Sequence, residues 1–379
     1  MNILINTTIA FVGGGVQLAD SIVRQFVSNK QHHFLLVYPK TMEKTADAIK
    51  FEENVELFPY EMPKYYMGLI TGHNSVLDKL VEEKKIDAVY SVMGPSRWKP
   101  QVPHLVGFAR CQAVIPESPY WGMLSTKERI KTQIQNIFLI NDFRKTSKAF
   151  WTENEFISSR LRDKLKKDAK VFTVTSTYNQ IYDNRDEWDK TVHFPAFDGM
   201  TLLTIAANYP HKNLRIIPQV IEYLNSAHPD MKYRFVMTLK GDEFGELNED
   251  IKKHIHFIGF VTINQCPYMY EQCDVMFLPS LLECFSACYA EAMRMQRAIL
   301  VPKIGFAERL CGQAAMYYEP TDVRSLGEAI YKLYCDKVLY RHLVDNGTQK
   351  LKEFNNYQSR ADKLLKIVEQ LPALYKENK

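Results

Sequence analysis

The stretch that most constrains the fold covers residues 274–293 and reads DVMFLPSLLECFSACYAEAM. Its first part, 274–278, is almost wholly apolar and is stopped by a Pro-Ser pair. That pattern is typical of a buried strand in a parallel sheet with helices on both faces. Residues 285–292 are small or favour a helix, and Ser286 is a suitable N-cap residue. The stretch therefore predicts a strand, a short turn and a helix.

A turn from strand to helix favours a bound anion, because free backbone N–H groups and the positive end of the helix dipole point out of it. A phosphate fits such a turn, with the backbone of Phe285, Ser286 and Ala287 as donors. Two carboxylates bracket it, since Glu283 precedes the helix and Glu291 follows eight positions later. This spacing is also common among solvated helix charges, so the context has to decide between the two interpretations.

The context is an apolar strand, a Pro-Ser stop, Glu283, then Glu-Ala-Met, and a second apolar run at 298–301. This order resembles the donor-site signature of the family-four retaining glycosyltransferases, in which E-x7-E lies inside PS-x-x-E-G-F-G-x-x-x-x-E-A-M. The resemblance implies a GT-B architecture, two Rossmann-like, doubly wound α/β domains facing across a cleft. It also implies that Glu283 contacts the donor sugar and Glu291 the ribose, and that the nucleotide-sugar is a substrate, with no cofactor.

Length and pattern agree with two domains. The chain has 379 residues, which is too long for one ordinary core, and 46% of its residues are hydrophobic. Residues 177–200 are polar and aperiodic, as expected for an interdomain linker. We expect an N-terminal acceptor-side domain at 1–180, joined by a C-terminal helix within 357–379, and a donor-binding domain at 181–356. The resemblance covers the second half nearly continuously and the first half only loosely.

Strand and helix patterns alternate in both halves, as in doubly wound domains. Expected strands of the first half are 2–8, 33–38, 55–58, 87–93 and 170–176, with helices at 74–85 and 125–141. Expected strands of the second half are 202–206, 233–239, 256–258, 274–278 and 298–301, with helices at 216–224 and 324–334. The segment 104–119 is less regular, and a lone histidine there, His104, is interpreted as a core residue.

A glycine run, 13–15, follows the first expected strand and precedes a helical pattern. Glycine lets a backbone come close to a ligand, but a loop that needs positive φ would also use it. The resemblance implies that Gly14 and Gly15 face the donor phosphates.

Lys212 stands at another turn from strand to helix, about seventy residues before Glu283. It resembles the family's phosphate-holding Lys, whose charge offsets the charge on the leaving diphosphate. Ala207 stands where the family commonly has Arg. No Asp-x-Asp metal motif is apparent, so we predict metal-independent catalysis by Lys212 and Glu283.

The Gly-Phe pair at 259–260 ends another expected strand. In the resembling family the backbone after such a pair lies against the nucleotide base, which implies a donor-binding role for Phe260 and Val261. The alternative is that Phe260 packs in the core.

The resulting hypothesis is a retaining hexosyltransferase that uses a UDP- or GDP-linked sugar and a hydroxyl of a glycan or lipid-linked acceptor, in cell-surface polysaccharide or lipopolysaccharide synthesis. Cys284 and Ser286 stand where the family has Gly, and positive φ at either would cost about 1 to 2 kcal/mol. A non-catalytic scaffold, or a nucleotide-sugar epimerase of the same fold, is therefore an alternative.

Positive charge is concentrated at 127–170, with twelve Lys or Arg against six Asp or Glu, whereas the whole chain carries +4. Within it, a helical pattern sets four apolar residues apart from basic ones; the apolar residues are Ile130, Ile134, Ile137 and Phe138, and the basic ones are Lys127, Arg129 and Lys131. The ordinary interpretation is a solvated face, and the alternative is an anionic membrane surface or a phosphate-linked lipid acceptor. No interleaved aromatics point to nucleic acid.

Neither a signal-like N-terminus nor an apolar run of about 18 residues is evident, so we expect a cytoplasmic protein, peripheral at the inner membrane face. The seven cysteines show no metal-ligand spacing and are expected to be reduced and buried.

Overall fold

The structure is a computed structural model that describes residues 1–9, 14–62 and 72–376. The chain forms two compact units, which are treated separately below. The first unit comprises 1–116, 125–176 and 355–379, and the second comprises 117–124 and 177–354. The units divide after residue 176, whereas the sequence pattern suggested 180, and no pattern had assigned 117–124 to the second unit.

The first unit contains a seven-stranded parallel sheet in the order β3-β2-β1-β4-β5-β6-β7. Its strands are β1 (Asn2–Asn6), β2 (His33–Tyr38), β3 (Val55–Pro59), β4 (Ala88–Ser91), β5 (His104–Gly107), β6 (Ala149–Thr152) and β7 (Lys170–Thr173). Its helices are α1 (Gly14–Val27), α2 (Glu43–Ile49), α4 (Ser75–Glu83), α6 (Thr126–Thr146), α7 (Glu155–Arg162) and α15 (Tyr357–Lys376).

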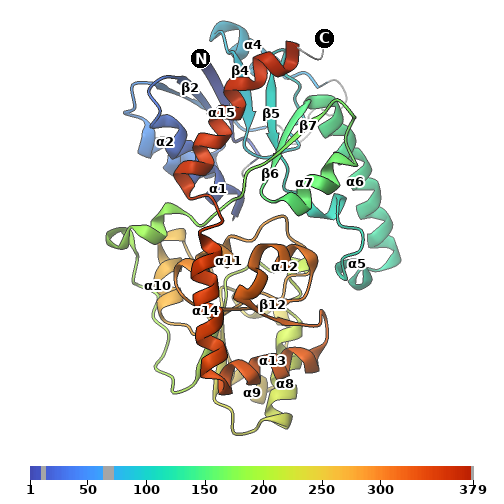
Figure 1. Ribbon diagram of the computed structural model, residues 1–379, viewed down its shortest axis with the longest axis vertical. Helices are drawn as coiled ribbons and strands as arrows, with labels where there is room; N and C mark the ends of the chain where they lie inside the picture. The colour runs from blue at the N-terminus through green and yellow to red at the C-terminus, as the bar shows by residue number, and fades with distance from the viewer. Residues whose placement is uncertain (10–13, 63–71, 377–379) are drawn as a thin grey trace. The chain divides into compact units, whose positions relative to one another are not determined.

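Helices cover both faces of this sheet, as the continuous apolar strands predict. Successive side chains of a strand point to opposite faces, so Ile3 and Ile5 belong to one core and Leu4 to another. The first core includes apolar residues of α1 and α15, which run side by side (Figure 1). The second core includes apolar residues of α4.

The C-terminal helix α15 is tied to this unit by a buried arginine as well as by apolar packing. Arg360 is 1% exposed and donates from Nη1 to Ser176 Oγ (3.1 Å) and from Nη2 to Ser21 Oγ (2.6 Å). Burial lowers the pKa of Arg360 to about 10. Because its guanidinium bridges α1 and the end of the β7 segment, α15 is part of the first unit.

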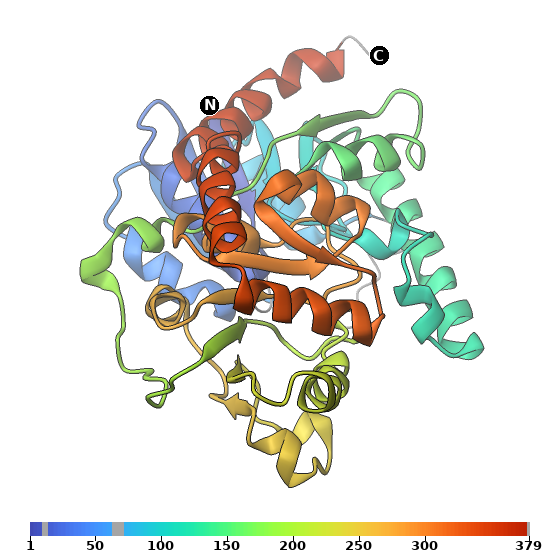
Figure 2. The same cartoon turned by 60° about the horizontal axis from the view of Figure 1, so that its bottom comes forward.

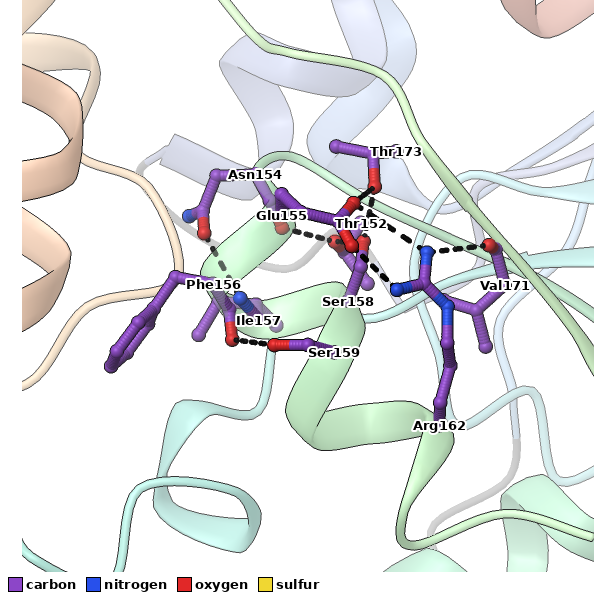
Figure 3. Close-up of polar contacts among 10 residues, drawn as sticks. All are labelled: Thr152, Asn154, Glu155, Phe156, Ile157, Ser158, Ser159, Arg162, Val171 and Thr173. Carbon is purple, nitrogen blue, oxygen red and sulfur yellow. Dashed lines mark hydrogen bonds and ion pairs between the residues drawn. The ribbon is translucent and has the colours of Figure 1, made fainter.

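Helix α7 is held between β6 and β7 by a network of hydroxyl groups and charges (Figure 3). Ser158 Oγ lies 2.7 Å from Thr152 Oγ1 and 2.6 Å from Thr173 Oγ1. Glu155 contacts both Thr173 and Arg162, and this guanidinium lowers the pKa of Glu155. The network fixes the edge of the sheet at β7.

Helix α6 departs from the predicted amphipathic pattern. Figures 1 and 2 both show it at one edge of the first unit, beside α7 and away from α2. The four residues predicted to form its apolar side are exposed rather than packed, namely Ile130 (52%), Ile134 (49%), Ile137 (61%) and Phe138 (71%). Contacts with the unit come instead from the C-terminal part of α6, where Ile140 and Phe143 are buried.

The second unit contains a six-stranded parallel sheet in the order β10-β9-β8-β11-β12-β13. Its strands are β8 (Met200–Thr204), β9 (Tyr233–Met237), β10 (Ile255–Phe257), β11 (Val275–Phe277), β12 (Ala298–Pro302) and β13 (Ala315–Tyr318). Its helices are α5 (Tyr120–Met123), α8 (Ile216–Ala227), α9 (Glu249–Lys252), α10 (Cys266–Glu271), α11 (Ala287–Arg294), α12 (Gly305–Cys311), α13 (Val323–Cys335) and α14 (Lys337–Leu351).

The predicted doubly wound α/β class is confirmed. In each sheet the first strand lies in the middle, the next two extend to one side, and the fourth returns to its other side. The crevice at the carboxyl ends of these two central strands is where open α/β sheets bind ligands. That place is β1 and β4 in the first unit, and β8 and β11 in the second.

Two further findings concern membranes and cysteines. Among the described helices, none is both long enough and apolar enough to cross a bilayer. All seven cysteines are free, but Cys335 is exposed and Cys288 half-buried, so the prediction that all are buried is wrong at these two positions.

Candidate functional site

The carboxyl ends of β8 and β11 bring together two residues that lie 71 positions apart. Lys212 ends the 3-10 helix η5 (Pro210–Lys212) after β8, and Glu283 follows β11. Lys212 Nζ pairs with Glu283 Oε1, and the two side chains are only 16% and 11% exposed. Each charge would be costly to bury alone, and the ion pair offsets that cost. This is the strongest electrostatic feature at the switch point of the second sheet.

The loops that carry this pair are bonded to each other. Leu281 N donates to His211 O (2.8 Å), and Ser280 Oγ donates to the same oxygen (3.4 Å). Asn213, next to Lys212, has φ +51°, a left-handed conformation that Asn tolerates better than most residues. The ion pair is therefore held by backbone geometry on both sides.

His211 is a site residue that the sequence did not single out. Its ring stacks on Tyr209 at a centroid distance of 5.6 Å and meets Tyr120 edge-on at 6.2 Å. Burial lowers the pKa of His211, although the charge of Glu283 acts in the opposite direction. In the sequence, only its position directly before Lys212 indicated that His211 belongs to the site. Its partner Tyr120 comes from segment 117–124, which has no motif of its own.

The N-terminus of α11 lies directly after Glu283. Ser286 occupies the N-cap position, as predicted, with φ −110°, but its side chain makes no capping hydrogen bond. Phe285 and Ala287 flank it at the start of the helix, as the sequence predicts. Neither Cys284 nor Ser286 has positive φ, so the strain expected where the family has Gly does not arise.

Glu291 is deeper in the unit than the sequence indicates. It is 4% exposed, and its Oε2 accepts a hydrogen bond from Tyr270 Oη (3.1 Å) on α10. Burial raises the pKa of Glu291 to about 7, and bonds from neighbouring groups, including Tyr270, oppose the rise. Burial raises the pKa of the Cys288 thiol, and the charges of Glu291 and Glu283 add to this rise, so the thiol lies near both carboxylates. Glu291 is therefore a buried carboxyl that titrates near neutral pH.

The aromatic residue that follows β10 is exposed to solvent. Phe260 is 87% exposed, which excludes the alternative that it packs in the core, and it follows Gly259, whose φ is +74°. Val261 is half-buried. Phe285 is half-buried, and its ring centroid lies 6.0 Å from that of Phe354.

Gly14 and Gly15 are the first residues of α1 in the first unit. Neither has positive φ, so a strained loop does not explain them. A Cβ added at Gly14 would meet nothing within 4 Å, and one at Gly15 would meet Met93 Sδ at 3.4 Å. The rest of the predicted glycine turn, 11–13, lies outside the described residues.

Two other sequence predictions concern metals and His104. Across residues 1–9, 14–62 and 72–376, no group of three or more His, Cys, Asp or Glu could hold a metal ion. His104 is 1% exposed and hydrogen-bonded at both ring nitrogens, to Ser91 Oγ (2.8 Å) and Thr146 O (3.1 Å). The interpretation of His104 as a core histidine is confirmed.

The part of the chain that contains the ion pair matches a known family. Residues 199–336 match the family described as glycosyl transferases group 1. Over this segment the chain is similar to the group 1 glycosyltransferases. Lys212, Phe260, Glu283 and Glu291 all lie within the matched residues.

A curated relative and two solved structures are also similar to this chain. The chain is 23% identical over 178 residues to the GPI3 subunit of phosphatidylinositol N-acetylglucosaminyltransferase from Saccharomyces cerevisiae, an alignment that covers 45% of this chain and 39% of that protein. The chain thus spans about two fifths of the length of that relative.

The two structures are similar over nearly their whole length. WaaG, a glycosyltransferase involved in lipopolysaccharide biosynthesis, has a TM-score of 0.65 at 12% identity, over 97% of this chain and 99% of its own. HepE from Anabaena, solved with UDP and glucose, has a TM-score of 0.68 at 14% identity, over 98% and 100%. The chain therefore has the fold of the GT-B glycosyltransferases.

Proposed function

We propose that this protein is a retaining glycosyltransferase that moves a hexose from a UDP- or GDP-linked sugar to a hydroxyl of a glycan or lipid-linked acceptor. The observation that carries the proposal is the buried Lys212–Glu283 pair at the switch point of a group 1 segment. A cation, a carboxylate and a helix N-terminus meet there. Together they suit a sugar diphosphate, whose phosphates are anionic and whose sugar donates hydrogen bonds.

The proposed reaction uses few protein groups. The bond between the anomeric carbon and the diphosphate oxygen breaks, and the acceptor oxygen bonds to the same face of that carbon. The acceptor proton passes to the leaving phosphate oxygen, so no separate base is required. Lys212 and the N-terminal N–H groups of α11 stabilise the charge that grows on the diphosphate. Glu283, oriented by Lys212, accepts a hydrogen bond from a sugar hydroxyl.

We assign the rest of the nucleotide to neighbouring residues of the second unit. The exposed ring of Phe260 and the backbone of Val261 lie after β10 and would receive the base. Glu291 would hold the ribose through Oε1, the carboxylate oxygen opposite the one bonded to Tyr270. Phe285, Ser286 and Ala287 would contact the diphosphate through their backbone. In the first unit, Gly14 and Gly15 are proposed to let the backbone approach the donor.

Metal independence is part of the proposal, because Lys212 and the helix N-terminus take the role that a divalent cation plays in other transferases. Transfer should persist in excess EDTA. A strict requirement for manganese or magnesium would contradict this mechanism.

For the acceptor side we propose contact with an anionic membrane at the cytoplasmic face, as in lipopolysaccharide or other cell-surface glycan synthesis. The support is the exposed apolar stripe of α6, defined as Ile130, Ile134, Ile137 and Phe138, on the helix that also carries Lys127 and Lys131. An apolar face bordered by Lys is the pattern of a helix lying in a membrane interface. The phosphatidylinositol in the name of the yeast relative agrees with a lipid acceptor.

The membrane proposal can be tested with vesicles of phosphatidylglycerol and of phosphatidylcholine. We expect salt-sensitive binding to the anionic vesicles, reduced in the variant Ile134→Ser/Phe138→Ser and in one with Lys127, Arg129 and Lys131 made neutral. The matched control is Phe51→Ser/Val338→Ser, which changes two apolar residues elsewhere that are even more exposed. Equal binding to both vesicle types would remove the membrane from the proposal.

The function itself is tested by a panel of UDP, GDP, ADP and their common sugars. A cognate ligand at about 100 times its dissociation constant should stabilise the protein by about 2.7 kcal/mol. Transfer of label from the matching nucleotide-sugar to an acceptor, with the anomeric configuration read by NMR, then completes the assignment. Epimerised sugar formed without an acceptor would indicate an epimerase. Binding without any turnover would indicate a scaffold.

A further inference from the structure

The first unit has a cavity at the edge of its sheet opposite to the switch point. Its volume is about 140 Å³, and it lies at the amino ends of β5, β6 and β7, with Tyr375 of α15 at one side. Every residue that lines it belongs to the first unit. The cavity therefore does not depend on the second unit or on the donor site.

Charge distinguishes this cavity. Its lining includes the cationic residues Lys99, Arg144, Lys145, Lys148 and Lys166, and a single carboxylate, Asp168. These cations come from the loop before β5, the last turn of α6, and the loops before β6 and β7. Asp168 Oδ2 lies 3.6 Å from Lys148 Nζ, so its charge balances that of one of the five cations. Like charges gathered at one hollow repel one another, and a bound anion relieves that repulsion.

Two lining residues, His104 and Tyr375, are hydrogen-bonded within the first unit. Tyr375 Oη donates to His104 O (3.0 Å) and accepts from Lys148 N (3.1 Å). His104 Nδ1 lies 3.1 Å from Thr146 O and must carry the ring proton, since a carbonyl oxygen only accepts. Burial lowers the pKa of His104 to about 4, so the ring is uncharged at neutral pH. The positive charge at the cavity therefore comes from its Lys and Arg side chains.

The cavity is large enough for one phosphate group. Its volume of about 140 Å³ leaves room for several waters, since one water needs roughly 10 to 15 Å³ of such space. The C-terminal end of the α6 dipole is negative and opposes an anion, but Arg144 and Lys145 lie in that last turn and offset it.

We propose that this cavity is a second anion site, which binds one phosphate group through Lys148, Lys166 and their cationic neighbours. The phosphate is either free inorganic phosphate or the phosphomonoester of a lipid head group. The site serves neither the donor diphosphate nor the sugar, because the proposed donor residues that carry charge lie in the second unit.

Calorimetric titration with inorganic phosphate at constant ionic strength tests the site. We expect one saturable site that Lys148→Gln/Lys166→Gln weakens by at least about tenfold, since two charge-assisted contacts are lost. Lys252→Gln/Lys253→Gln removes the same charge from exposed positions of α9 and its C-cap and should bind as the parent does. Both Lys148 and Lys166 are at the surface, and an unchanged melting temperature verifies that the variants are folded.

Phosphate could also bind at Lys212, so a third variant separates the two sites. Binding that survives in Lys212→Ala and falls in Lys148→Gln/Lys166→Gln supports the cavity. Binding lost in Lys212→Ala and retained in Lys148→Gln/Lys166→Gln overturns it, as does the absence of any saturable binding at millimolar phosphate. Because the donor site has its own variant, failure of the proposed function and failure of this site give different patterns.

Dihexanoyl phosphatidic acid, a water-soluble lipid with a phosphomonoester head group, distinguishes the two sources. Tighter binding of this lipid than of inorganic phosphate, weakened in Lys148→Gln/Lys166→Gln, supports a lipid head group. Equal affinity for both, weakened in the same variant, supports free phosphate. Binding of the lipid that this variant leaves unchanged, with no binding of inorganic phosphate, contradicts the site.

Discussion

The two sheets share one strand order but differ in what stands at their switch points. In the second unit, β8 and β11 lead to the ion pair of Lys212 and Glu283. In the first unit, β1 and β4 lead to buried neutral groups. Asn6 Nδ2 donates to Ser91 Oγ (3.1 Å), and Thr8 Oγ1 donates to Asn6 Oδ1 (2.8 Å). Five cations of the first unit line the cavity at the opposite edge, at β5 to β7.

This difference shows that the fold supplies a crevice while the side chains decide its chemistry. A diphosphate is attracted to the charged switch point, whereas the described residues directly at the ends of β1 and β4, 6–9 and 91–94, carry no charge. The predictions below test whether charge at one switch point, and neutrality at the other, account for the function.

The largest effect is expected from Lys212→Ala. Loss of the cation that stabilises the leaving diphosphate should lower turnover by about 100- to 1000-fold, the range found when one stabilising donor is removed from an active site. The assay is transfer from the cognate nucleotide-sugar, with Lys252→Ala on α9 as the control for loss of an exposed Lys.

Two comparisons sharpen this result. Lys212→Ala leaves Glu283 buried without its partner, so Lys212→Ala/Glu283→Gln separates lost stability from lost catalysis. An equally large loss in Ser91→Ala of the first unit would break the contrast between the charged and the neutral switch point.

The next effect concerns stability and pH at Glu291. Burial raises the pKa of this carboxyl from 4.5 to about 7, so the folded protein holds a proton that the unfolded chain releases. Ionising Glu291 therefore lowers the free energy of unfolding. The loss is absent below pH 4.5, grows as the pH rises to about 7, and is constant above. At 1.36 kcal/mol per pKa unit it reaches about 3 kcal/mol.

Urea unfolding at pH 5 and pH 8 measures this loss. The parent should lose more stability than Glu291→Gln between the two values, because the amide has no proton to release. Glu222→Gln, on the exposed face of α8, should behave as the parent does. A difference between parent and Glu291→Gln that is the same at both pH values would show that Glu291 is ionised throughout.

A smaller effect separates the two carboxylates of the second unit. If Glu283 contacts the reacting sugar and Glu291 the ribose, Glu283→Gln lowers turnover while nucleotide binding is retained, and Glu291→Gln weakens the nucleotide. One charged acceptor is worth roughly 1.5 to 3 kcal/mol, or about ten- to a hundredfold in the affected step. Calorimetry with the nucleotide, paired with the transfer assay, tells them apart. No change in either variant would reduce both residues to structural charges.

Much of the fold follows from local pattern. The strand over 33–38 matches β2 at both ends, and those over 55–58 and 298–301 match β3 and β12 to within one residue. These runs are apolar and bounded by turns. Strands β5, β6 and β13 were missed, and so was α14. Length alone does not explain this, because β4 and β7 have the same four residues and were predicted. Strand β5 lies in the segment 104–119, whose pattern is irregular.

The site was predictable only where motif and topology coincide. Lys212 and Glu283 each follow a strand, and parallel strands bring their carboxyl ends to one edge, so their meeting follows from the sequence. The burial of Glu291 against Tyr270 does not, because Tyr270 lies on a helix whose packing depends on the whole unit. The sequence placed Ile134 and Phe138 on one side of a helix but did not decide whether that side is packed or exposed, since an apolar stripe on a helix ordinarily indicates the face that packs.

The smallest effect is expected at Gly14, where α1 begins beside the neutral switch point. Alanine fits there, because an added Cβ meets nothing within 4 Å and the residue does not have positive φ. Gly14→Ala should therefore stabilise the protein, by up to about 0.4 to 1 kcal/mol. Gly122→Ala in α5 is a matched control, since it too is helical and has open space around its Cβ.

The two glycine variants then differ in activity if the first unit receives a ligand at its switch point. A methyl group at Gly14 would keep the donor from the backbone and raise the KM for the nucleotide-sugar a few-fold, in a protein that is no less stable. Gly122→Ala should leave KM unchanged. If both variants gain stability and neither changes KM, Gly14 serves only the start of α1, and the donor depends on the charged switch point alone.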